Sequence, residues 1–253
     1  MPDLDIFFEQ YSTGFLCGDE ERDRNVRLKI EHTRNVCHLA THIAEASELD
    51  TKTRQLAGAA ALLHDFGRFE QIKRYNTFSD AHSVNHGELG AGLLAEIGFP
   101  GDFTPAERNM IIAAVRHHNA VALPDELDET TRTITNIVRD ADKLDIVEIV
   151  LTYHVKQLDN PQVTLNLSPE RRLTPIIAAA SAAGQPASYR DMKTFSDFAV
   201  IKLAWFFQLV FAASKQEFIH REFPQRLKAF IGDIPEARCV YDAFNRAAGV
   251  TLL

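Results

Sequence analysis

The dipeptide His64-Asp65 places an imidazole and a carboxylate directly after an apolar stretch. Residues 59–63 are three alanines and two leucines, which predicts a buried helix that ends at this pair. A buried carboxylate is costly unless it is paired or bound to a metal, so the context favours a metal ligand. The pair alone is weak evidence, because a cationic histidine also suits the C-terminal end of a helix.

Two more histidines lie on the apolar faces of other predicted helices. Spacings of three and four residues place His32 on the inward face of a helix over residues 24–48. His86 begins the apolar face of a helix over residues 83–97, whereas His82 lies in a polar stretch before it. Taken singly, each has an ordinary alternative as a hydrogen-bonded core histidine.

The last two candidates follow the same pattern. Thr104 opens a helix that runs to about residue 118, and His118 continues its inward face. His117 falls about 100° away around the helix axis, so His118 is the preferred ligand, although the choice between the two stays open. Asp142 lies on the apolar face of a helix predicted over residues 130–157. Its neighbours Asp140 and Lys143 lie off that face, where we expect solvated side chains.

Together these residues predict a metal site. Imidazoles and carboxylates from several helices would be strongly unfavourable in one core unless cations bind them. Such ligands suit divalent metal ions, and six ligands are enough for two ions. The candidates are Fe, Mn, Mg, Ni, Co and Zn. The six predicted metal ligands are His32, His64, Asp65, His86, His118 and Asp142.

The order His, His-Asp, His, His, Asp resembles that of the HD superfamily of metal-dependent phosphohydrolases, over about residues 24–150. Residues 64–68 are similar to the HD-x-G-K/R stretch of several members, and residues 86–90 to the histidine segment of those that bind two metals. Two departures are the absence of a GYP signature and His117, which stands where an aromatic or apolar residue is expected.

This resemblance implies a helical bundle with the metals in its middle. It implies that His32, His64, Asp65 and Asp142 hold one metal, and that Asp65, His86 and His118 hold the second. Asp65 would then bridge the two ions. The chain also resembles uncharacterised bacterial HD proteins that carry a C-terminal helical extension.

The expected activity is hydrolysis of a phosphate ester, a monoester or a diester, with nucleotides among the candidates. Two cations about 3.5–4 Å apart can share a water molecule and supply hydroxide near neutral pH. We expect Asp65, Arg68 and Lys143 to take part in catalysis, Arg68 by gripping phosphate oxygens. Arg68 has a structural alternative as a solvated cation at a helix end. Asp145 is a candidate for orienting a ligand.

Two other functions remain open. Some HD-fold enzymes hold two irons with the same ligand set and use dioxygen, which makes a di-iron oxygenase the first alternative. The second is a regulatory ligand-binding module. The aromatic stretch that contains Trp205, Phe206, Phe207 and Phe211 would then form a ligand pocket or a homodimer interface, although such a stretch is more often ordinary core.

The elements that must position these residues are helices throughout. No segment alternates as a half-buried strand would, so we predict an all-α fold, an HD-domain helical bundle with a C-terminal helical extension. The expected domains are residues 1–160 and 161–253, packed as one structural unit. Further helices are predicted over residues 52–66, where Gly67 would stop the helix, from residue 195 after a Thr194 cap, and over 236–248. Pro175 and residues around 166–169 mark a predicted loop.

The amino-acid composition limits the classes of binding partner that we expect. The 253 residues carry 27 Lys and Arg against 35 Asp and Glu, a net charge of −8, which disfavours nucleic acid and leaves a small phosphorylated substrate. Three cysteines without CxxC spacing favour a reducing cytoplasm. The apolar stretch over residues 195–213 contains polar and charged residues, so we expect a core helix and no membrane span, and residues 1–15 do not resemble a signal peptide.

Overall fold

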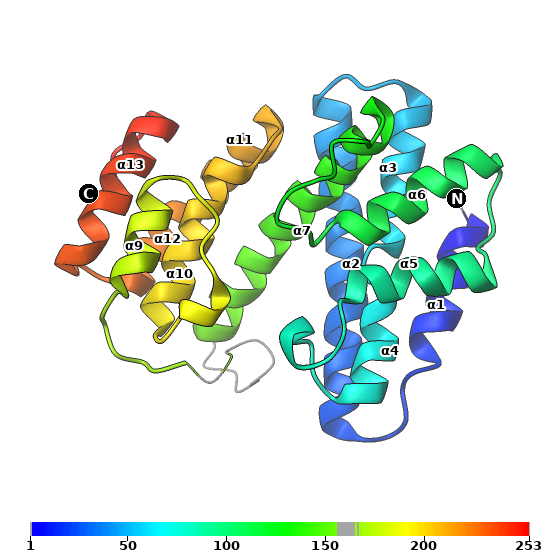
Figure 1. Ribbon diagram of the computed structural model, residues 1–253, viewed down its shortest axis with the longest axis horizontal. Helices are drawn as coiled ribbons and strands as arrows, with labels where there is room; N and C mark the ends of the chain where they lie inside the picture. Colours follow the sequence, from blue (N-terminus) through cyan, green and yellow to red (C-terminus); the bar gives the residue numbers. More distant parts are fainter. Residues whose placement is uncertain (1, 156–164, 166, 253) are drawn as a thin grey trace. The chain divides into compact units, whose positions relative to one another are not determined.

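The computed structural model describes residues 2–155, 165 and 167–252. In these residues the only β-type pairing is an isolated bridge between Ser168 and Thr194, so the predicted all-α fold is confirmed. The α-helices, labelled in Figure 1, are α1 Pro2–Thr13, α2 Glu20–Ala46, α3 Thr51–Leu63, α4 Phe66–Tyr75, α5 His86–Ile97, α6 Pro105–His117, α7 Glu129–Val155, α9 Pro175–Ala182, α10 Phe195–Ala204, α11 Ala212–His220, α12 Phe223–Ile231 and α13 Arg238–Ala248. Short 3-10 turns η1 Asp80–His82, η2 Tyr189–Asp191, η3 Trp205–Gln208 and η4 Pro235–Ala237 lie between them.

The chain divides into two compact units, Met1–Asp145 and Ile146–Leu253, and α7 contributes residues to both. The predicted domain boundary between residues 160 and 161 lies outside the described residues, as do residues 156–157 at the end of a predicted helix. The prediction that the extension packs on the first domain as one structural unit stays a prediction.

Helix α3 is the central element of the first unit. Its residues 56–63 are buried except for the half-buried Gly58, as expected for a helix that is apolar all around. Small alanine side chains allow close packing, and both α2 and α6 pack against α3. Val36 and Ile43 of α2 are fully buried, which confirms the inward face predicted for that helix.

Helix α4 corrects two expectations from the sequence. The helix predicted over residues 52–66 ends at Leu63, and a new helix begins at Phe66. Gly67 therefore lies in the first turn of α4, so the prediction that it stops a helix is wrong.

The prediction of a loop at Pro175 is also wrong. Pro175 occupies the first turn of α9, where its fixed φ suits a helix.

Helix α10 is the centre of the second unit and packs against α9, α12 and α13. Its residues 196–204 are all buried, which confirms the prediction of a core helix over this stretch. The helix is shorter than the apolar run, since η3 follows it directly and α11 begins only at Ala212. Phe206 packs its ring against Phe244, with centroids 5.0 Å apart, and is buried in the core, whereas Trp205, Phe207 and Phe211 are half-buried.

Among the described residues, none of the helices combines the length and the apolar character that crossing a bilayer would require.

Candidate metal centre

The six predicted ligands come together within the first unit as two groups of three. The ligand atoms within each group lie within 4.8 Å of one another. We call them the first triad, His32, His64 and Asp142, and the second triad, Asp65, His86 and His118. His32 lies within α2 and Asp142 within α7, whereas His64, Asp65, His86 and His118 lie at helix ends or directly beside them.

Asp65 lies between the two triads. Its Oδ2 atom is 3.6 Å from Nε2 of both His32 and His64. Its Oδ1 atom is 3.4 Å from Nε2 of His86 and 3.8 Å from Nε2 of His118. One carboxylate oxygen thus faces the histidines of each triad, which is the arrangement that a bridging ligand requires.

The corner between α3 and α4 fixes the direction of His64 and Asp65. These two residues are the whole connection, because α3 ends at Leu63 and α4 begins at Phe66. Phe66 is fully buried, and Tyr11 of α1 stacks on its ring at a centroid distance of 3.6 Å. The hydroxyl of Tyr11 also donates to the carbonyl of Phe66 at 3.3 Å. The aromatic anchor therefore holds the corner in the core.

Glycines bring α4 and α5 close enough for His86 to reach Asp65. A Cβ atom on Gly67 would lie 2.2 Å from the carbonyl oxygen of His86 and 2.6 Å from the backbone nitrogen of Gly90. A Cβ on Gly87 would lie 2.7 Å from the carbonyl oxygen of Arg116 in α6. These glycines, which belong to the segments that carry the family resemblance, allow close helix contact.

Each of the four imidazoles is held through its Nδ1 atom. His32 faces Asp145 Oδ2 at 2.6 Å, and His86 faces Asp80 Oδ2 at 2.7 Å. In the other two, Nδ1 donates to the carbonyl oxygen three residues earlier on the same helix, at 2.7 Å for both His64 and His118. Because carbonyl and carboxylate oxygens accept, Nδ1 carries the hydrogen, and a neutral ring then has its lone pair on Nε2.

The Nε2 atoms converge in pairs. Those of His86 and His118 are 2.9 Å apart, and those of His32 and His64 are 3.3 Å apart. Burial lowers the pKa of His86 and of His118 to about 4, so both rings are neutral at pH 7. Two lone pairs at this separation repel each other, and a cation between them removes the repulsion. The residues therefore fit bound metal ions.

In the first triad, His32 is hydrogen-bonded to two carboxylates, those of Asp142 and Asp145. Burial and Lys29 lower the pKa of His32, but hydrogen bonds to Asp142 and Asp145 outweigh them and raise it overall. Asp142 Oδ1 is 3.1 Å from His32 Nε2. Burial raises the pKa of Asp142, yet His32 and His64 hold it well below its usual range. A metal ion at His32 Nε2 would displace the proton that this arrangement favours.

Arg68 and Lys143, the predicted catalytic cations, lie beside the triads with partners of their own. Arg68 Nη1 donates to Asp80 Oδ1 at 2.9 Å and to Gln71 Oε1 at 2.7 Å, while its Nε atom lies 3.5 Å from Asp65 Oδ1. Lys143 donates to the carbonyl of Arg139 at 3.5 Å, and burial lowers its pKa to about 8. Their catalytic roles stay predictions.

The four other histidines of the first unit, among them the rejected candidates His82 and His117, lie outside both triads. His38 and His42 are exposed, His82 is exposed on η1, and His117 is half-buried beside Arg116. One expectation here is wrong, because Asp140 is fully buried and not solvated.

Two residues that the sequence patterns did not single out contact the triads directly. Lys29 Nζ lies 2.7 Å from Asp65 Oδ2 and 5.3 Å from the ring centroid of Phe78. Asp80 contacts His86 as described above. Lys29 precedes His32 by three residues, a spacing that places both on one side of a helix, so the sequence contained a signal for it. Asp80 lies on the short turn η1, for which the sequence contains no periodic signal.

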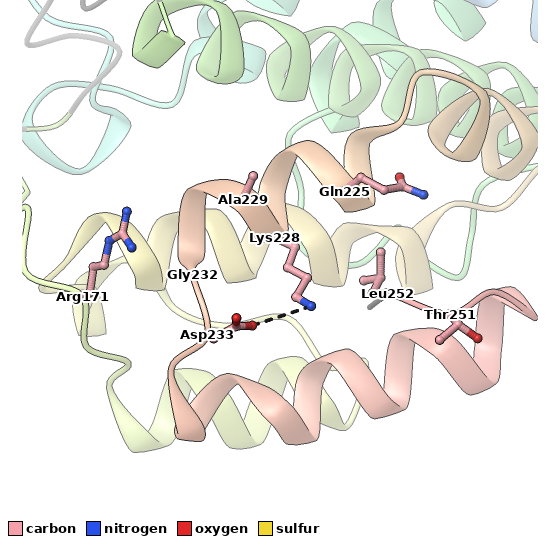
Figure 2. Close-up of a pocket in the computed structure, with 8 residues that line it drawn as sticks. All are labelled: Arg171, Gln225, Lys228, Ala229, Gly232, Asp233, Thr251 and Leu252. Atoms are coloured by element: carbon pink, nitrogen blue, oxygen red, sulfur yellow. Dashed lines mark ion pairs between the residues drawn. The ribbon is translucent and has the colours of Figure 1, made fainter.

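A hollow of about 520 Å³ lies in the second unit and is separate from both triads (Figure 2). Arg171, Lys228 and Asp233 line it together with Thr251 and Leu252, and Lys228 Nζ lies 3.6 Å from Asp233 Oδ1. It contains none of the six residues that converge in the first unit.

Fold and site together define a class: an all-α protein with buried histidines and carboxylates arranged to bind divalent metal ions. The family model described as HD domain matches residues 30–147, a range that contains both triads and Asp65 between them. Residues 30–147 are therefore an HD domain, and the family resemblance seen in the sequence is confirmed over this range. No curated protein and no solved structure matched the chain.

Proposed function

We propose that the chain is a metal-dependent phosphohydrolase that cleaves a small phosphate ester. The observation that carries the proposal is the position of Asp65, one oxygen of which faces the histidines of each triad. The two triads fit two cations that share this carboxylate. His32, His64 and Asp142 would hold one ion together with Asp65, and His86 and His118 would hold the other with the same carboxylate.

Two bound cations would lower the pKa of a water molecule that they share and would neutralise charge on a phosphoryl group. The role of the protein groups is to orient the histidines. Asp145 and Asp80 fix the ring orientation of His32 and His86 through Nδ1. Backbone carbonyls do the same for His64 and His118, so all four Nε2 atoms stay directed inward.

The charge at the accessible side of the site favours an anionic substrate. The imidazoles of both triads are at most 4% exposed, whereas Lys29 is 14% exposed, Arg68 15% and Asp142 17%. Solvent therefore reaches the site past two cationic side chains and the carboxylate of Asp142, which a metal ion would neutralise. In a chain with a net charge of −8, this local positive charge, together with the metal ions, would attract a phosphate group.

Lys29 is the better placed of the two cations for contact with substrate. Its ammonium contacts Asp65 Oδ2, whereas Arg68 Nη1 is already engaged by Asp80 and Gln71. Lys29 can turn from Asp65 to a phosphate oxygen once a metal ion has neutralised that carboxylate. Arg68 would keep a supporting role beside it.

The test is a metal-stripped protein reloaded separately with Mn²⁺, Mg²⁺, Co²⁺ and Ni²⁺ and screened against phosphate monoesters and diesters. We expect hydrolysis that requires added metal and disappears in Asp65→Ala. His82→Ala is the matched control, since His82 is exposed and lies outside both triads. Full activity of metal-free Asp65→Ala would overturn the proposal. Oxygen consumption by an iron-loaded protein without phosphatase activity would support the oxygenase instead.

A further inference from the structure

The histidines of the two triads are held by the same two kinds of hydrogen-bond partner, a backbone carbonyl and a carboxylate. The carboxylate partners are not part of the sequence motif. In each triad, one histidine is held by a backbone carbonyl three residues earlier, His64 in the first and His118 in the second. The other histidine in each is held by a carboxylate. Asp145 holds His32 at 2.6 Å, and Asp80 holds His86 at 2.7 Å.

Asp80 is itself held by side chains from three elements. Its Oδ1 atom accepts from Arg68 Nη1 and Gln71 Nε2 of α4, both at 2.9 Å. Its Oδ2 atom accepts from Asn119 Nδ2, which follows α6, at 3.0 Å, and from His86 of α5. Both oxygens are thus occupied, and the carboxylate has little freedom to turn away from the imidazole.

Gln71 anchors this arrangement to the core. Its side chain is fully buried, and its Nε2 atom also lies 2.9 Å from Ser83 Oγ and 3.0 Å from the carbonyl oxygen of Val84. These contacts hold the segment that contains the turn η1 against α4. Asn119 Nδ2 also contacts Asn85 Oδ1 at 3.0 Å, and Asn85 caps the start of α5 immediately before His86. The position of Asp80 and the start of α5 are therefore coupled.

We propose that Asp80 is a positioning residue for the second metal ion and that occupancy of the second triad depends on it. This inference rests on the proposed function, since it assumes that the triads bind metal. The first ion would have two carboxylate ligands, Asp142 and the shared Asp65, whereas the second ion would have Asp65 alone. Binding of the second ion therefore depends more on the orientation and basicity of His86 and His118, and a carboxylate partner on Nδ1 raises the basicity of His86.

The experiment compares Mn²⁺ binding to the full-length wild type, Asp80→Asn and Asp145→Asn by calorimetric titration. We expect the wild type to bind two ions. Asp80→Asn should lose about 10- to 100-fold in affinity for one ion and keep the other, as is typical for partners of metal-bound histidines. Asp145→Asn should instead weaken the binding of the other ion, the one held by the first triad. An unchanged pair of affinities in Asp80→Asn would overturn the inference, whereas a wild type that binds no Mn²⁺ would overturn the proposed function.

Electron paramagnetic resonance gives a second readout, of whether both sites are filled. With two equivalents of Mn²⁺, two ions that share Asp65 in the wild type should show exchange coupling, whereas Asp80→Asn, shown to be folded by circular dichroism, should show the resolved hyperfine pattern of isolated ions. Exchange coupling that persists unchanged in Asp80→Asn would contradict the proposal.

If Asp80→Asn fails to fold, the wild type still tests the inference. Nitrogen NMR of labelled histidines in the Zn²⁺-loaded protein should show His86 protonated at Nδ1, with a strongly hydrogen-bonded proton. A His86 ring protonated at Nε2, or bound to metal through Nδ1, would show that Asp80 does not position it for the second ion.

Discussion

His117 and His118 are adjacent in the chain, and the structure separates their environments. His118 is buried with Nε2 directed at His86, whereas His117 is half-buried and belongs to neither triad. We predict that His118→Ala weakens Mn²⁺ binding by more than the roughly 100-fold typical of losing a partner of a ligand. His117→Ala should bind Mn²⁺ as the wild type does. Titration of both variants with Mn²⁺ measures this difference, and equal losses in the two would contradict the assignment.

Cys37 allows a prediction about reactivity. Burial raises the pKa of its thiol to about 12, despite the opposing effect of Arg34, whereas Cys17 and Cys239 are exposed. The thiolate is the reactive form, and Cys37 forms very little of it at pH 8. We therefore expect a disulfide reagent to modify Cys17 and Cys239 quickly in the native protein and Cys37 only after denaturation. Three equal rates at pH 8 in the folded chain would be inconsistent with this burial.

The convergence of the six predicted ligands could be expected from the sequence because each interrupts an apolar helical pattern, which a single chain displays without any tertiary information. Lys29 and Asp145 each lie three residues from a ligand on the same helix, so spacing alone indicated a neighbour but not its contact. Asp80 could not be found in this way. It reaches His86 only because η1 is held against α4 by contacts across the fold.

At the scale of the elements, the approach of α4 and α5 gives a stability prediction with an internal control. Gly67→Ala places a Cβ against the backbone of His86 and Gly90, so overpacking should lower the free energy of unfolding by about 1–3 kcal/mol. Gly92→Ala, on the exposed side of α5 with no atom within 4 Å of its Cβ, should raise it by about 0.5–1 kcal/mol. Urea denaturation of the two variants measures both changes.

The opposite signs are the decisive part of that comparison. A loss of stability in Gly92→Ala would mean that α5 is not formed as described, and a neutral Gly67→Ala would mean that the two helices are further apart. Because Gly67 faces the backbone of His86, its variant should also bind Mn²⁺ more weakly. Gly92→Ala should leave binding unchanged.

Helices with a clear apolar periodicity were predicted well from the sequence. Helices whose ends depend on tertiary contacts were not. The helix predicted over residues 24–48 corresponds to α2 at Glu20–Ala46, and the Thr104 cap forms a full capping box with Glu107 at the start of α6. Helix α4 was missed because Gly67 carries the same local signal whether it ends a helix or allows another to approach. Only the packing partner distinguishes these cases.

At the scale of the whole molecule, metal binding should be visible as thermal stabilisation. A ligand that binds only the folded state adds about 2.7 kcal/mol when its concentration is 100 times its Kd. Since both triads lie within Met1–Asp145, we predict that Mn²⁺ raises the unfolding temperature of that unit in scanning calorimetry. The shift should be smaller in His118→Ala. A scan that does not respond to Mn²⁺ would count against a metal site.

Lys29 has a consequence for how the protein can be handled. Its ammonium contacts Asp65 Oδ2 at 2.7 Å, so this carboxylate has an internal counter-ion even before any metal arrives. An uncompensated buried charge would be strongly destabilising, and Lys29, which is closer to Asp65 than Arg68 is, supplies the larger part of the compensation. We therefore expect that chelation and reloading with another divalent ion leave the chain folded. Lys29→Met should remove this tolerance, so that chelation precipitates the protein.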